Sequence, residues 1–472
     1  MIRYIVNRWQ TEGGYREFLK IAFPLILSTG ASSIQHFVDR MFLTWYSTEA
    51  MAAALPAGMT NFVLASFFMG IASYINTFVA QYTGAGLPRR VGPSLWQGGY
   101  LSAISAIASI GLFILSAPIF NFIGHEPTVR NYEIVYFSTL CFGIPFLILS
   151  TSLSCFYSGQ GKTWTVFNVN VGATAVNILF DYGLIFGNWG FPMWGIRGAA
   201  WATNIAQIFA AFVFCVLLLR RKYQRKFATL SGWRFDRKLF ERLLRFGGPN
   251  GVTFMLDMMS FSLFIIIIGR SGTVQLTATN LAFNVNILAF MPLMGAGIAV
   301  STMVGQRLGQ NRPQAAAYAT WSALHLAQLY MCIMASAYLF VPELFLFPYG
   351  VGASGEDFEA AKEMALQLLK IVAIYCVFDG IYMIFTSALK GAGDTRFILL
   401  AGLICSWFIM LIPAFIAHTF FGASLYVLWG FICAYIMVGS LVFWWRFKQG
   451  KWMSMRVIES ESLEPVSDAA GS

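Results

Sequence analysis

Long apolar segments separated by short polar ones follow one another along the chain. A helix needs about 20 residues to cross the hydrocarbon core of a membrane, and twelve segments are long enough. They lie at 21–45, 52–80, 95–119, 133–157, 165–187, 195–219, 243–268, 277–304, 316–341, 364–389, 397–418 and 424–446. Backbone in lipid must satisfy its own hydrogen bonds, which leaves helices or a closed barrel. The segments are too long and continuous for barrel strands, so the pattern predicts an all-α membrane protein with twelve transmembrane helices.

Composition supports this interpretation. Of the 472 residues, 58% are hydrophobic and 11% are charged, whereas soluble domains carry about 25% charged residues. The surplus apolar surface is therefore expected to face lipid. The seven cysteines lie in apolar segments without C-x-x-C spacing, which is typical of small buried hydrophobes rather than of disulfides or metal ligands. Pro145, Pro292 and Pro413 lie within predicted spans and are expected to kink them.

Lysine and arginine indicate the orientation of the spans. If both termini and every second loop lie on one side, that side holds 25 of the 31 basic residues; the other six are Arg40, Arg130, Arg197, Arg270, Lys362 and Lys370. Basic residues accumulate on the cytoplasmic side of membrane proteins. We therefore expect a multi-pass protein of the plasma membrane, the inner membrane of a bacterium, with both termini in the cytoplasm.

The chain contains an internal repeat. Residues 17–86 align with residues 242–311 without a gap, at an offset of 225. The matched pairs include Pro24 with Pro249, Asn61 with Asn286, Gln81 with Gln306 and Gly84 with Gly309. Because each repeat holds an even number of spans, we expect two six-helix bundles of the same orientation, related by a pseudo-twofold axis along the membrane normal. Transporters built in this way hold the substrate between the repeats near mid-membrane.

The repeat and the charges define the expected domains. An N-lobe covers residues 1–219 and a C-lobe covers residues 243–447, each with six transmembrane helices. For the basic cytoplasmic linker at 220–242, two interpretations stay open: a surface helix that contacts anionic lipid, or a linker whose charge serves topology. Residues 448–472 are expected to be a cytoplasmic, disordered tail.

Four carboxylates fall inside the predicted spans. They are Asp39, Asp181, Asp257 and Asp379, in spans 1, 5, 7 and 10. Ionisable groups are costly in lipid and usually face a polar cavity or an ion pathway. A carboxylate in apolar surroundings retains a proton more readily, and an arriving cation favours the ionised form and expels that proton. This competition is the simplest coupling mechanism for an antiporter, although a helix–helix hydrogen bond is an alternative role for each acid.

Polar side chains lie one helical turn from three of these acids. Asn177 precedes Asp181 by four residues, and Tyr375 precedes Asp379 by four, so each pair shares a helix face. Gln35 and His36 lie within one turn before Asp39. We therefore predict coupling residues Asp39, Asn177, Asp181, Asp257 and Asp379, with Gln35, His36 and Tyr375 in support.

No catalytic or cofactor motif is present. The chain lacks G-x-x-x-x-G-K-[ST], H-E-x-x-H and G-x-S-x-G, and GQGKT at 159–163 is only a fragment of the first. We therefore expect neither an enzyme nor a cofactor. The 45 phenylalanines and 20 methionines suit an adaptable cavity for flat, cationic, apolar ligands.

The chain resembles the MATE (multidrug and toxic compound extrusion) family, in its NorM-like and DinF-like branches, over about residues 15–447. The resemblance is carried by an ordered set of motifs. They are FPLILSTGASSIQHFVDRMFLTW in span 1, VAQYTGAG and VGQRLGQ after spans 2 and 8, FYSGQGKT after span 4, NILFDYGLIFG with GIRGAAWATNIAQ around span 5, and SALKGAGDTR after span 10.

The resemblance implies multidrug and organic-cation efflux by antiport against H⁺ or Na⁺, with alternating access around a central cavity between the lobes. It places the ion either at Asp39, Asn177 and Asp181, or at Asp257 and Asp379 with Tyr375 one turn away. Asp257 stands where NorM-like members usually have Glu, so we favour the first set. The implied partners are small cationic or amphipathic drugs and membrane lipid, with no nucleic acid and a monomeric chain.

Three other functions stay open at this point. The first is a flippase for lipid-linked oligosaccharides of the same superfamily, whose cavity should be basic. The interior carboxylates disfavour it. The others are a channel and an intramembrane enzyme, which the repeated halves and the missing catalytic motifs disfavour.

Overall fold

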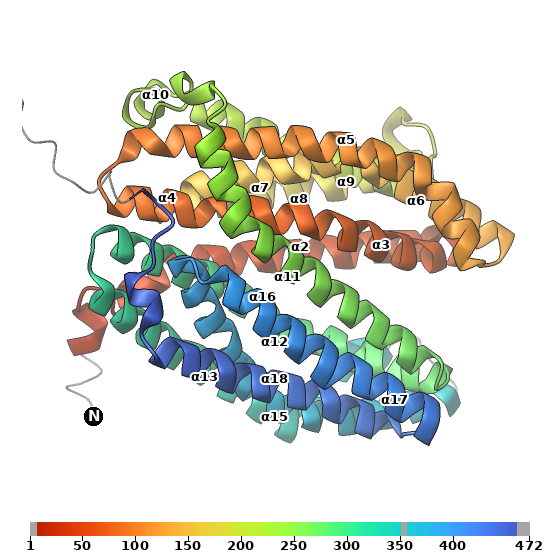
Figure 1. Ribbon diagram of the computed structural model, residues 1–472. Coiled ribbons are helices and arrows are strands. Elements are labelled where there is room, and N and C mark those ends of the chain that lie inside the picture. The colour runs from red at the N-terminus through yellow and green to blue at the C-terminus, as the bar shows by residue number, and fades with distance from the viewer. Residues whose placement is uncertain (1–6, 351–355, 460–472) are drawn as a thin grey trace, which may run out of the picture. The chain divides into compact units, whose positions relative to one another are not determined.

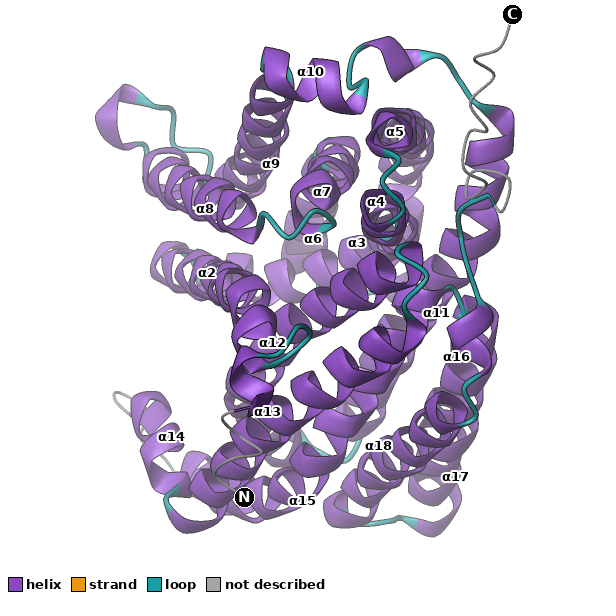
Figure 2. Cartoon of the chain, turned by 90° about the vertical axis from the view of Figure 1, so that its left-hand side faces the viewer, coloured by secondary structure: helices purple, strands orange, loops and turns teal. Residues whose placement is uncertain are grey.

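The computed structural model describes residues 7–350 and 356–459. Within these ranges the chain is almost entirely helical and contains no strand (Figure 2). Among the described residues, eleven helices are long and apolar enough to cross a membrane, and the number becomes twelve if the bent pair α6–α7 is one span. The predicted all-helical membrane fold is thus confirmed, and each predicted segment coincides with one helix or with two or three consecutive helical elements.

The first repeat and the linker that follows it contain the helices coloured red to green in Figure 1. They are α2 (Tyr15–Tyr46), α3 (Thr48–Ser73), α4 (Ile75–Gly84), η1 (Pro88–Arg90), α5 (Val91–Ile123), α6 (Pro127–Cys141), α7 (Ile144–Ser158), α8 (Thr163–Phe186), η2 (Asn188–Gly190), α9 (Ile196–Leu218), α10 (Arg221–Phe227) and η3 (Ser231–Trp233). Here α8 packs on α9, α3 on α6, and α5 on α7.

The second repeat continues from green to blue (Figure 1). Its helices are α11 (Arg237–Gly269), α12 (Thr273–Gly309), α13 (Pro313–Phe340), α14 (Pro342–Gly350), α15 (Glu356–Ala392), α16 (Thr395–Leu403), the π-helix η4 (Ile404–Leu411), α17 (Ile412–Phe421), α18 (Leu425–Lys448) and η5 (Lys451–Ser454). In this part α15 packs against both α13 and α18.

A sharp bend accompanies one of the three prolines at which we expected kinks. The bent pair α6–α7 turns by 43° at Phe142–Gly143. Pro145 lies in the first turn of α7, where its missing N–H needs no partner. Pro413 lies in the first turn of α17, directly after the π-helix, within a span that runs on from Thr395 to Phe421. Likewise, α12 continues through Pro292 without interruption.

The chain forms two compact units whose boundaries differ from the predicted lobes. Of the described residues, one unit comprises 7–26, 256–304, 312–350 and 356–455, and the other comprises 27–255, 305–311 and 456–459. The boundaries therefore fall inside α2, α11 and α12 rather than in the linker. The start of α11 belongs with α3 because Asn250 donates a hydrogen bond to the Gly70 carbonyl at 2.6 Å. A Cβ on the neighbouring Gly251 would overlap the Phe67 carbonyl oxygen.

The N-terminal residues of the predicted N-lobe belong to the other unit for a similar reason. The Arg8 guanidinium donates to Ser322 Oγ at 2.9 Å and to the Tyr318 carbonyl at 3.1 Å, both on α13. It also lies 4.2 Å from the centre of the Tyr318 ring. This buried cation–π and hydrogen-bond contact fixes the chain start against α13.

The predicted disordered tail begins as ordered structure, which corrects the sequence interpretation. After α18, the buried Trp452 of η5 donates to the Phe447 carbonyl at 2.8 Å. Residues 456–459, which we call the C-terminal strap, then pack within the unit that contains α4. The apolar pair Val457 and Ile458 is buried there, and burial of this pair explains why the segment is held. Residues 460–472 lie outside the described residues.

Polar contacts hold both ends of the strap. The Val457 N–H donates to Gln81 Oε1 at 2.9 Å. Glu459 accepts from the Tyr82 hydroxyl at 2.7 Å and pairs with Arg242 at 2.6 Å. Burial raises the pKa of the Glu459 carboxyl, but the bonds from Tyr82 and Arg242 outweigh burial and hold the pKa below its usual range.

The repeated glycines meet each other. A Cβ on Gly84 would overlap the carbonyl oxygen of Gln306, and a Cβ on Gly309 would overlap the carbonyl oxygen of Gln81. The ends of α4 and α12 therefore approach so closely that only glycine fits at either position. All four residues belong to the same compact unit. The motifs VAQYTGAG and VGQRLGQ thus have a packing role that their sequence alone did not reveal.

Candidate functional site

Three of the predicted site residues come together between α2 and α8. Asn177 and Asp181 are fully buried on one face of α8, as their spacing predicts, and Asp39 approaches from α2. In the amide orientation that satisfies both carboxylates, the Asn177 nitrogen donates to Asp39 Oδ1 at 2.9 Å and to Asp181 Oδ2 at 3.2 Å. The amide therefore bridges the two acids and fixes their separation.

The two carboxyl groups also lie close enough to interact directly with each other. Two neighbouring carboxyl groups in buried surroundings favour a state in which one of them carries a proton. The second oxygen of Asp181, Oδ1, is buried and has no hydrogen-bond partner among the described residues. Buried polar atoms are nearly always paired, so this oxygen is available to a proton or a cation. The pair can hold either one in a setting that disfavours two negative charges.

Apolar side chains exclude water from one end of this site. Phe42 and Leu43, one turn after Asp39, and Ile185, one turn after Asp181, belong to a buried cluster that also contains Ile196. A low-dielectric border of this kind strengthens every electrostatic interaction of the acids. The charge state of the pair is therefore strongly coupled to whatever occupies it.

Three further polar residues belong to the neighbourhood of the acid pair. Tyr136 of α6 lies close enough to interact electrostatically with both acids. His36 interacts with Asp39 along α2, but its side chain is exposed. Gln35, the third residue predicted in span 1, is half-buried one turn before Asp39. Tyr136 was missed because nothing in the sequence connects it with either acid.

The second predicted set, Asp257 and Asp379, lies in the other compact unit. Asp379 is buried on α15, near Tyr375 on the preceding turn, as their spacing predicts. Asp257 of α11 is half-buried and interacts with the Ser406 hydroxyl of η4 and with the charge of Lys390 of α15. The two carboxylates of this set thus have separate immediate partners, and one of them faces a lysine.

Lys390 lies near Asp257, a residue with which the sequence did not connect it. By sequence, Lys390 is one of the basic residues that follow span 10, on the side assigned to the cytoplasm. The structure continues α15 to Ala392, so Lys390 lies in the last turn of that helix.

Neither set is a conventional metal centre. The described residues contain no group of three or more His, Cys, Asp or Glu side chains that could hold a metal ion. A monovalent cation at the first set would therefore combine the two carboxylates with water. Oxygen ligands of this kind suit a hard cation.

Comparison with known proteins identifies a family. The MatE family model matches residues 24–183 and 249–416, which together make up more than half of the chain. The probable multidrug resistance protein NorM of Synechocystis sp. is 26% identical over 453 residues, covering 94% of this chain and 96% of the relative. The multidrug resistance protein PmpM of Pseudomonas aeruginosa is 26% identical over 394 residues, covering 83% and 81%.

Solved structures share the fold at low identity. A multidrug resistance MATE family transporter of the MOP superfamily, solved in an outward-facing conformation, superimposes with a TM-score of 0.82 at 17% identity, covering 96% of this chain and 99% of that one. A MOP superfamily transporter from Pyrococcus furiosus, described as having a binding pocket of reverse polarity, gives a TM-score of 0.79 at 17% identity, with 95% and 98% coverage.

Proposed function

Because the chain belongs to the MatE family, whose members are transporters and not enzymes, we propose that it exports cationic and amphipathic drugs in exchange for H⁺ or Na⁺. The drug class rests on the relatives, which are named multidrug resistance proteins. The exchange rests on the acid pair. The proposed location is a bacterial inner membrane, with both termini in the cytoplasm and a monomeric chain.

The observation that carries the coupling is the Asp39–Asp181 pair bridged by Asn177. Two neighbouring carboxyl groups exchange one proton for one cation without a large change in net charge. An ion shifts a conformational equilibrium only when it binds the two states with different affinity. In our proposal, loading the pair favours one access state, and release of the ion favours the other.

An acidic interior also separates this proposal from the transport of lipid-linked polyanions. A carrier of negatively charged head groups needs basic side chains where its cargo binds. The pair Asp39 and Asp181 is of the opposite sign, and it attracts cations. We therefore do not advance the flippase alternative.

The experiment is efflux of a cationic dye from proteoliposomes under separately imposed pH and Na⁺ gradients. We expect one gradient to drive dye movement in the unaltered protein, and Asp181→Asn to abolish that dependence. The matched control is Glu343→Gln, which neutralises an exposed acid at the start of α14. Gradient-driven efflux that persists in both Asp181→Asn and Asp39→Asn would disprove coupling through the pair.

A further inference from the structure

The linker after α10 lies along α5. Trp96 of α5 donates its indole N–H to the Thr229 carbonyl at 2.8 Å, and the Tyr100 hydroxyl donates to the Trp233 carbonyl. The Tyr100 ring also meets the Phe235 ring edge-on, with centroids 5.1 Å apart. At 1.5 Å per residue, the contact from Pro93 to Tyr100 follows α5 for about 10 Å. Residues 229–236 are thus a surface element with a fixed place on a membrane-spanning helix.

The face of α5 that carries this element continues as a lipid-facing stripe. Pro93, Trp96 and Tyr100 recur at helical spacing, and Ile104 and Ile107 extend the same row. Ile104 is 44% exposed and Ile107 is 73% exposed. The linker therefore covers this face of α5 as far as Tyr100, and beyond it the face is apolar and exposed. On a helix that crosses a membrane, a change from polar to exposed apolar surface marks the level at which head groups give way to acyl chains.

The linker presents aromatic and basic side chains at that level. Trp233 is 58% exposed and Phe235 is 53% exposed. Arg234, Arg237 and Lys238 are exposed beside them. Aromatic rings next to basic residues are typical of the membrane interface, and clustered basic residues attract anionic lipid.

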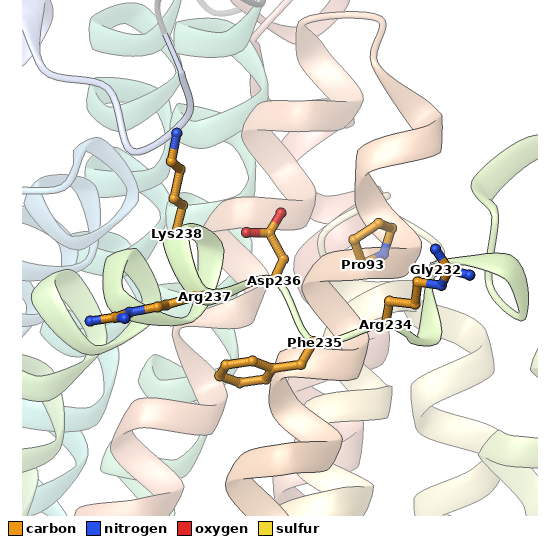
Figure 3. Close-up of a pocket in the computed structure, with 7 residues that line it drawn as sticks. All are labelled: Pro93, Gly232, Arg234, Phe235, Asp236, Arg237 and Lys238. Atoms are coloured by element: carbon orange, nitrogen blue, oxygen red, sulfur yellow. The ribbon is translucent and has the colours of Figure 1, made fainter.

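A shallow pocket of about 480 Å³ lies in this region. It is lined by Pro93, Gly232, Arg234, Phe235, Asp236, Arg237 and Lys238 (Figure 3). The one acidic residue of the lining, Asp236, already has a hydrogen-bond partner. Its Oδ1 accepts the Leu239 N–H at 3.0 Å and caps α11. Arg237 is partly engaged by Glu241 at 2.8 Å on the exposed surface. The pocket thus offers a basic rim around the apolar surfaces of Pro93 and Phe235.

The directions in which the basic side chains point indicate which kind of ligand fits this surface. Figure 3 shows Arg234, Arg237 and Lys238 pointing away from one another around the pocket. Side chains that diverge in this way do not enclose a single free phosphate. They suit a layer of head groups, with an acyl chain against Phe235 and the α5 stripe.

We propose that residues 229–238 and the α5 row from Pro93 to Ile107 form a binding surface for anionic phospholipid, in the leaflet that the basic residues assign to the cytoplasm. The surface is separate from the acid pair and does not depend on which ion is exchanged. It resolves the two interpretations of the linker in favour of lipid contact.

Native mass spectrometry of the full chain, titrated with phosphatidylglycerol and with phosphatidylethanolamine, tests this surface. We expect Arg234→Gln/Lys238→Gln to weaken phosphatidylglycerol binding by roughly 30-fold, from the usual contribution of two basic residues at an anionic surface. Phosphatidylethanolamine binding should be unchanged. The matched control is Arg225→Gln/Lys226→Gln, the same charge change at exposed residues of α10 in the same linker, and it should retain binding.

Two further measurements keep the proposal falsifiable. Arg234→Lys/Lys238→Arg keeps the charge and should bind phosphatidylglycerol as the unaltered protein does, which separates charge loss from misfolding. Soluble glycerol phosphate should not compete. The proposal is overturned if the control and the test variant lose binding equally, if neither loses it, if the charge-preserving variant loses it, or if glycerol phosphate displaces the lipid.

Discussion

The two repeated halves share their packing but differ in their acids. Gly84 and Gly309 occupy equivalent positions and make equivalent close contacts. In the first half, Asp39 and Asp181 interact with each other and share the Asn177 amide. In the second half, Asp257 and Asp379 have separate partners, and Lys390 lies near Asp257. The two repeats thus share the glycines that a close backbone contact requires, but they differ in their ionisable groups.

This difference leads us to expect distinct tasks for the two acid sets. A bridged pair with one unpartnered oxygen can bind and release an ion. A carboxylate near a lysine is already stabilised by a positive charge, so it binds a cation from solution less strongly. We therefore expect the first set to dominate coupling, and the following experiments are ordered by the size of the effect.

Loss of the acid pair should have the largest effect. Asp39→Asn and Asp181→Asn each remove a charge that accepts hydrogen bonds in a buried site, and bonds to charged groups contribute about 1.5–3 kcal/mol. We expect initial rates of gradient-driven dye efflux to fall roughly 10- to 100-fold. Asp257→Asn and Asp379→Asn should lower the same rates by less than about threefold. An equal or larger loss in the second set would reverse our comparison.

Replacing either repeated glycine should destabilise the protein to a similar degree. Gly84→Ala and Gly309→Ala each insert a methyl group against a backbone carbonyl, and overpacking of this kind costs about 1–3 kcal/mol. Thermal unfolding in detergent, followed by the loss of monodisperse protein, measures the change. Gly86→Ala is not a suitable control, because its φ of 72° is itself strained for alanine. Gly111→Ala on α5, where a Cβ meets nothing within 4 Å, should be neutral or slightly stabilising.

Substituting the bridging amide should have an intermediate effect on transport alone. Asn177→Ala leaves both carboxylates but removes the donor that holds them together, at a cost of about 1 kcal/mol. Efflux should fall roughly fivefold. The control is Asn170→Ala, which removes a hydrogen bond to Ser28 Oγ elsewhere on the same helix pair. This variant should leave the ion dependence of efflux unchanged. If the ion dependence of efflux is unaltered in Asn177→Ala, the two carboxyl groups keep their arrangement without the amide.

The smallest effect is expected at the C-terminal strap. Glu459→Gln removes the ion pair with Arg242, which is partly exposed and contributes about 1 kcal/mol or less. Since the folded-state pKa of Glu459 is lowered, its stabilisation is present at neutral pH and is lost as pH falls through that pKa. The unfolding temperatures of the protein and the variant should therefore differ at pH 7 and converge in acid. A constant difference across pH would exclude the ion pair as the cause.

The spans could be predicted from the sequence because lipid requires long apolar helices. The shared face of Asn177 and Asp181 could be predicted because helical spacing is regular. Asp39 could be placed beside them only through the family resemblance, since the contact joins two helices far apart in the chain. Lys390 was not connected with Asp257 because the helix extends past its apolar segment. The strap was missed because two apolar residues, Val457 and Ile458, are followed by an acidic, polar end.

The glycine contact is reciprocal. Gly84 packs against Gln306, the counterpart of Gln81 in the second repeat, and Gly309, the counterpart of Gly84, packs against Gln81. A surface patch that binds a copy of itself defines the interface of a twofold-symmetric homodimer. At these glycines the two repeats of one chain therefore contact each other as the two subunits of such a homodimer do.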